Sequence, residues 1–140
     1  ASPTGNMQEL LSRRLGTGEA ERMRSDINRF VDGRIAYAKA AGNPAPDRET
    51  EVQRIMQMSP AAFQNELIAF NSQVQRLGAY NDAFAKHIKE KGTATGFDSS
   101  AIDRKVYLYN PATGQGGLAD PDKIAALKKK GYREVNELNR

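Results

Sequence analysis

The chain has 140 residues, enough for one domain with its own core, and its 39% hydrophobic and 27% charged residues are typical of a globular protein. It has no cysteine, which excludes disulfides, thiolate nucleophiles and Cys-based metal sites, and its single histidine, His87, leaves no pair of imidazole ligands. No apolar run approaches the roughly 18 residues of a membrane span and Ala1–Asn6 is polar, so we expect neither a span nor a signal peptide.

The chain begins with two predicted helices. A short helix is expected over Met7–Leu15, ended by Gly16-Thr17-Gly18. Apolar residues recurring at three- and four-residue steps then predict an amphipathic helix over Glu19–Ala41. We expect Thr17 to be its N-cap and Gly42 to end it.

Proline marks the next boundaries. Asn43–Pro46 breaks the second helix, and Asp47–Met58 predicts a short third one. Ser59 supplies an N-cap oxygen directly before Pro60, whose missing N–H costs nothing at the first position of a helix. The helix that follows is predicted to run to Lys91, a length of about 48 Å at 1.5 Å per residue.

This long helix carries an apolar repeat of 3.5 residues over about four heptads. Such a repeat packs along another helix as a coiled-coil-like seam, and its one polar member, Asn81, could fix the register or the number of partners. The simpler alternative is that the stripe packs against Glu19–Ala41 of the same chain. Gly78 argues against an uninterrupted helix, because an interior glycine costs about 1 kcal/mol relative to alanine. The predicted interface residues are Phe63, Leu67, Phe70, Val74, Leu77, Asn81, Phe84 and Ile88.

The last third of the chain changes pattern. Gly92–Ser100 is a linker by composition, and Lys105–Tyr109 is β-branched and aromatic, as strands are. Asn110–Gly114 predicts a turn into a second strand over Gln115–Ala119. Alternation places Tyr107 and its neighbour Leu108 on opposite faces of the resulting hairpin.

A helix and a last strand complete this part. Asp120 is the expected N-cap of a helix over Pro121–Lys130, with Ile124 and Leu127 facing inward and Gly131 as its stop. Residues 132–135 add a short strand. So small a module needs support, and we expect it to lean on a neighbouring subunit because the linker lets it reach away from its own helices.

The predicted fold is therefore mostly α. It consists of a helical hairpin or small bundle with one long helix, followed by a small C-terminal β-hairpin–helix–strand module. The corresponding division is a helical body over 1–91, a linker over 92–104 and a small α/β appendage over 105–140.

Nothing in the residues assembles catalytic machinery, so we expect no enzyme, no cofactor and no metal site. The glycines of residues 114–117 lack the lysine and Ser/Thr of a phosphate loop. No nucleophile accompanies His87, which is expected to be a partly exposed helix residue. Structural roles are expected for the C-terminal carboxylates Asp98, Asp103, Asp120 and Asp122.

A run of three lysines ends the last predicted helix. Lys128, Lys129 and Lys130 are possible phosphate contacts, although cations at a helix C-terminus are also what the helix dipole favours. The net charge of +4 likewise permits binding to nucleic acid, but scattered Arg and Lys are more typical of a solvated surface.

Two segments resemble a known group of proteins. Residues 79–84 (AYNDAF) running into 91–98 (KGTATGFD) resemble a helix followed by a GT-x-x-GFD pattern in internal virion proteins of tailed bacteriophages. Residues 106–114 (VYLYNPATG), followed by a helix and then Gly131-Tyr132, resemble short C-terminal modules of phage particle proteins. The resemblance implies a structural, DNA-ejection or head–tail component, located in the virion and in the cytoplasm during assembly.

The function expected from these observations is non-enzymatic assembly of a phage particle through helix-mediated protein contacts. The partner would be the chain itself or other virion proteins, with DNA contact possible. One alternative is a basic adaptor that binds nucleic acid through its Arg and Lys surfaces. Another is a secreted or host-directed effector without an active site of its own.

Overall fold

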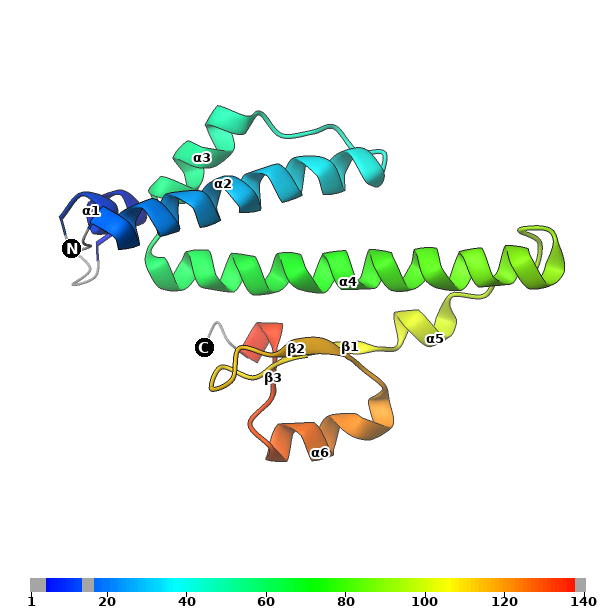
Figure 1. Ribbon diagram of the computed structural model, residues 1–140. Coiled ribbons are helices and arrows are strands. Elements are labelled where there is room, and N and C mark those ends of the chain that lie inside the picture. Colours follow the sequence, from blue (N-terminus) through cyan, green and yellow to red (C-terminus); the bar gives the residue numbers. More distant parts are fainter. Residues whose placement is uncertain (1–4, 14–16, 138–140) are drawn as a thin grey trace. The chain divides into compact units, whose positions relative to one another are not determined.

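The computed structural model describes residues 5–13 and 17–137, whose course Figure 1 shows. The chain divides into two compact units, Ala1–Leu67 and Ile68–Arg140. The boundary falls inside the longest helix, α4 (Pro60–Lys91). The predicted fold class is confirmed: the chain is mostly helical, with one long helix and a small C-terminal β-hairpin–helix–strand module.

The first unit is a small helical bundle. It contains α1 (Met7–Arg13), α2 (Thr17–Ala40), α3 (Arg48–Met56) and the first two turns of α4. The core forms where the apolar stripes of these helices meet, and the rings of Phe30 and Phe63 pack edge to face at 5.6 Å between α2 and α4. The most deeply buried side chains of the unit are Met7, Ile27, Val31 and Ile55.

Local sequence signals set most helix ends in this unit. The Asp47 carboxylate accepts a hydrogen bond from the Thr50 N–H at 3.0 Å and caps α3. The Ser59 hydroxyl accepts from the Ala62 N–H at 3.1 Å, which confirms the predicted start of α4. At the end of α2, Gly42 has a φ of +74°, as the predicted glycine stop requires.

Two predicted boundaries need correction or fall outside the described residues. Thr17 is the first residue of α2 rather than its N-cap, and Gly18 is helical rather than part of a break. The predicted end of the first helix at Leu15 lies outside the described residues. Helix ends fray, so their assigned positions commonly differ by one or two residues.

The second unit combines the remainder of α4 with a small sheet. After α5 (Ser100–Asp103) the strands β1 (Val106–Tyr109) and β2 (Gly116–Ala119) form the predicted hairpin, in which Val106 pairs with Ala119. The short strand β3 (Arg133–Glu134) pairs antiparallel with the other edge of β1, so the strand order is β2-β1-β3. Tyr107 and Leu108 are both buried, which means that both faces of β1 are covered.

The helix after the hairpin starts differently from the prediction. Its first turn is the 3₁₀ helix η1 (Pro121–Lys123), and the α-helix α6 covers Ile124–Lys129. Asp120 occupies the predicted N-cap position, but its side chain makes no cap hydrogen bond, and its carboxylate lies 3.2 Å from Lys105 Nζ. Lys105 and Asp120 flank the paired ends of β1 and β2, where Val106 pairs with Ala119. Gly131, with a φ of +103°, ends α6 as predicted.

The segment predicted to be a linker, 92–104, contains α5 and is hydrogen-bonded to α4 of the same unit. The Arg76 guanidinium donates hydrogen bonds to the carbonyls of Ile102 and Lys105 at 2.7 and 2.8 Å. The Tyr80 hydroxyl also bonds Asp103. These contacts join the start of the C-terminal module to α4 of the same chain, and support from a neighbouring subunit stays a prediction.

One glycine of the hairpin has no room for a side chain. A Cβ at Gly116 would overlap the Tyr107 hydroxyl, and Tyr107 is buried. We expect Gly116→Ala to lower the free energy of unfolding of this unit by about 1–3 kcal/mol, as overpacking does. Gly117→Ala is the matched control, because a Cβ there meets its nearest atom at an ordinary 3.7 Å. Equal urea midpoints for the two variants would contradict this assignment.

Candidate protein interaction surface

The predicted seam is divided between the two units, and its residues have different surroundings. Phe63 is 4% exposed and packs against Phe30 of α2, so the alternative of packing within the chain holds for this residue. Leu67, Phe70 and Leu77 are half-buried. The beginning of the seam is therefore at least partly used for the fold itself.

The rest of the seam lies open on α4. Val74 is 42% exposed, Phe84 41% and Ile88 36%, and these are the large hydrophobic side chains exposed in the described part of the chain. Asn81, which lies one heptad from both Val74 and Ile88, is also exposed. Gly78 and Ala85 lie between them, and α4 continues through Gly78 without a break. We call this set the α4 outer face: Val74, Gly78, Asn81, Phe84, Ala85 and Ile88.

The polar side chains of α4 that bind the segment after it lie outside the outer face, whereas Phe97 of that segment packs against Phe84. Arg76, Tyr80 and His87 each hydrogen-bond a residue between 95 and 105, and all three are half-buried. The outer face itself contains no charged residue. It is thus an uncharged apolar strip with one amide, on a helix of 32 residues.

The three lysines at positions 128–130 differ in their contacts. Lys128 Nζ lies 2.7 Å from a carboxylate oxygen of Glu134 and 3.0 Å from one of Glu137, and these hydrogen bonds raise the pKa of Lys128. Lys129 and Lys130 are exposed. Of the three predicted phosphate contacts, Lys128 is already neutralised by two carboxylates.

Two of the carboxylates singled out in the sequence make local hydrogen bonds. Asp98 accepts a hydrogen bond from the Ser100 N–H at 2.9 Å, which lowers the pKa of Asp98, and Asp103 accepts from the Ser99 hydroxyl at 3.0 Å. Across residues 5–13 and 17–137, no group of three His, Asp or Glu side chains is placed to hold a metal ion. His87 lies half-buried on α4, and its Nε2 is 2.9 Å from the Thr95 carbonyl oxygen.

A hollow of about 480 Å³ lies beside β2. Its lining has no side chain that is charged at neutral pH. The lining residues are Leu108, Gln115, Gly116, Gly117, Leu118, Ala119, Leu127 and Tyr132.

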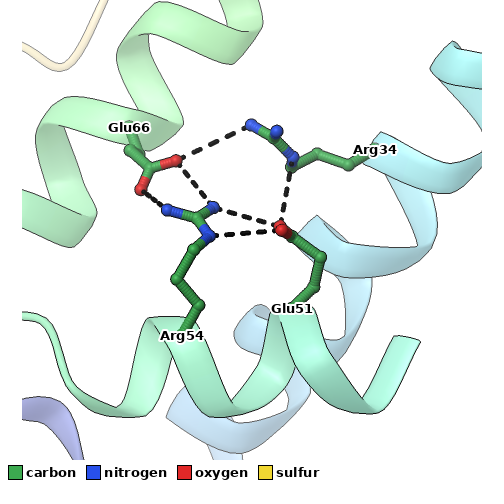
Figure 2. A network of polar contacts seen from close by, with 4 residues as sticks. All are labelled: Arg34, Glu51, Arg54 and Glu66. Atoms are coloured by element: carbon green, nitrogen blue, oxygen red, sulfur yellow. Dashed lines mark hydrogen bonds and ion pairs between the residues drawn. The ribbon is translucent and has the colours of Figure 1, made fainter. Parts of the chain in front are cut away.

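Sequence reasoning missed an ion-pair network in the first unit. Figure 2 shows Arg34 of α2, Glu51 and Arg54 of α3, and Glu66 of α4 in mutual contact. Arg54 Nη1 donates to Glu66 at 2.8 Å and Arg54 Nη2 donates to Glu51 at 3.0 Å. Arg34 Nε lies 3.3 Å from Glu51, although it is not aligned for a hydrogen bond. The network joins three helices. Of its contacts, the i,i+3 pair of Glu51 and Arg54 was visible in the sequence.

Comparisons with protein-family models, with curated proteins and with solved structures gave no match for this chain. Of the helices in the described residues, none is both long enough and apolar enough to cross a membrane.

Proposed function

We propose that this chain is a non-enzymatic structural or assembly protein that acts through helix-mediated protein contacts, and that its partner is a second copy of itself. The phage particle is the proposed setting, on the strength of the sequence resemblance alone. The observation that carries the contact is the α4 outer face, where three exposed large hydrophobic residues share one side of one helix. Such a patch favours contact with a partner over exposure to water.

The heptad positions favour a second copy as the partner. Val74, Asn81 and Ile88 fall at position a, because each precedes the next by seven residues, and Leu77 follows at d. β-branched residues at a combined with leucine at d favour two-stranded coiled coils, and one asparagine at a specifies register. No charge stands on the outer face, so two copies meet there without like-charge repulsion.

The contact is expected to be weak. Standard interfaces contribute about 20–30 residues from each partner, whereas the outer face has six. Dissociation in the micromolar range is therefore expected for two chains alone. Further contacts in an assembled particle would add to it.

Substitution of the two β-branched residues tests the proposal. We expect wild-type chain at high micromolar concentration to show a dimer mass by light scattering, and Val74→Ser combined with Ile88→Ser to return the mass to that of a monomer. Both side chains are more than a third exposed, so the variant should still fold. The matched control is Gln73→Ser with Lys89→Ser, at exposed neighbouring positions with the same product residue.

Two outcomes would sink this proposal: a monomeric wild-type chain at every concentration, or an oligomer that the Val74/Ile88 variant leaves intact. The same measurement with added duplex DNA addresses the adaptor alternative. A complex that weakens steeply with salt would favour phosphate binding, whereas an apolar contact is insensitive to salt.

A further inference from the structure

The chain turns back on α4 directly after the outer face. Gly92, with a φ of +73°, ends the helix, and its N–H donates to the Ile88 carbonyl at 2.7 Å. Gly96, with a φ of +80°, makes a second turn, in which the Phe97 N–H donates to the Ala94 carbonyl at 3.2 Å. We call residues 92–98 the strap.

Phe97 anchors the strap on the last turns of α4. Its ring meets the ring of Phe84 edge to face, with centroids 5.2 Å apart and planes at 85°. The ring also contacts His87, with centroids 5.6 Å apart, and His87 Nε2 lies 2.9 Å from the Thr95 carbonyl oxygen. Phe84 belongs to the α4 outer face, so the strap touches that face from the side.

The attachment rests on few contacts. Residues 92–96 and Asp98 are exposed, and Phe97 is half-buried. An aromatic pair or a single hydrogen bond shifts an equilibrium by a factor of roughly two to twelve. A competing interaction of similar strength is therefore enough to detach residues 93–98 from α4.

Phe97 lies against a ring that the partner in a coiled coil would enclose. Phe84 falls at heptad position d, three residues after Asn81 at a. In a coiled coil each d side chain inserts into a hole formed by four residues of the facing helix. A ring that already has Phe97 against it is not free to be enclosed on that side.

We infer that the strap is an internal competitor for the α4 outer face, with Phe97 in the place of a partner side chain, so that pairing with a second copy displaces it. This inference rests on the proposed function. It gives the strap a regulatory role, because any interaction that moves Phe97 away from Phe84 strengthens association.

Removing the Phe97 ring tests the competition in the full chain. We expect Phe97→Ser to raise the association constant measured by sedimentation about tenfold, the upper end of what one aromatic pair contributes. Ala94→Ser, at an exposed strap position, is the matched control and should leave the constant unchanged. Phe97→Leu keeps an apolar side chain and should raise the constant less.

Folding is checked by helix content in circular dichroism. If Phe97→Ser loses helix content, the competition is tested instead by the association constant of Phe97→Leu. Amide hydrogen exchange of residues 93–97 in the wild-type chain gives a second test. That exchange should be faster in the associated form than in the monomer. Slower exchange on association would mean that the strap is part of the interface, and would overturn the inference.

Weaker or unchanged association of a folded Phe97 variant would also overturn it. The two proposals fail separately. Association that needs Val74 and Ile88 but ignores Phe97 would remove the strap's role and leave the proposed function standing. Association that ignores Val74 and Ile88 would remove the proposed function itself.

Discussion

Ile55→Ala is expected to lower the free energy of unfolding by about 2–5 kcal/mol, because the substitution leaves a cavity that a packed core fills only in part. Ile55 has no exposed surface, and α3, which carries it, packs against α2 and α1. Ile55→Val removes one methylene and should cost about 0.5–1.5 kcal/mol. Urea unfolding followed by circular dichroism measures both variants. A loss for Ile55→Ala no greater than that for Ile55→Val would contradict the assigned core.

Leu108→Ala is the counterpart in the second unit, since Leu108 is 1% exposed. Comparing the unfolding transitions of the two variants shows how far the two units unfold together. We expect each substitution to shift chiefly the transition of its own unit, because the residues around Ile55 and those around Leu108 belong to different compact units. The two units share the helix α4.

The elements that sequence reasoning placed well are those set by local chemistry. Ser59 with Pro60, and the stops at Gly42 and Gly131, depend on capping and on φ values that a few neighbouring residues determine. The same holds for the hairpin around Asn110–Gly114. The buried side chain of Asn110 accepts a hydrogen bond from the Ala112 N–H at 2.9 Å within this local turn.

What the sequence left open depends on residues far apart in the chain. The 4–3 spacing runs evenly from Phe63 to Ile88, yet Phe63 is buried against Phe30 and Ile88 is exposed. Periodicity identifies an apolar side of a helix but does not say which part of it the rest of the chain covers. The contacts of the segment over 92–104 were missed for a related reason, since its glycines and threonines gave no sign that Arg76 would bind the carbonyls of Ile102 and Lys105.

The ion-pair network shows the same limit. Its four charges come from three helices, and in the sequence each looks like an ordinary solvated residue. Glu51 is 9% exposed, so it depends on the guanidinium groups of Arg34 and Arg54 to replace water. The network therefore holds α2, α3 and the start of α4 in one arrangement.

Glu51→Gln tests that dependence. The substitution keeps the shape of the side chain but removes its charge, and we expect it to lower the free energy of unfolding at pH 7 by about 1–3 kcal/mol. Removing one member of a fully buried pair costs about 3–5 kcal/mol, and the smaller value follows because both arginines are partly exposed and regain water. Glu49→Gln, at an exposed position of the same helix, is the control and should change stability by less than about 0.5 kcal/mol.

The effect should also depend on pH in a definite direction. Hydrogen bonds from Arg54 lower the pKa of Glu51 below its usual 4.5. A lowered pKa in the folded state means that the carboxylate stabilises the fold above the unfolded pKa, and that this contribution disappears as the pH falls through the folded pKa. The difference in the free energy of unfolding between wild type and Glu51→Gln, measured with urea, should therefore be constant from pH 7 to about 5. It should disappear as the solution becomes more acidic. A difference in the free energy of unfolding that persists well below the folded pKa would mean that Glu51 contributes through packing rather than through its charge.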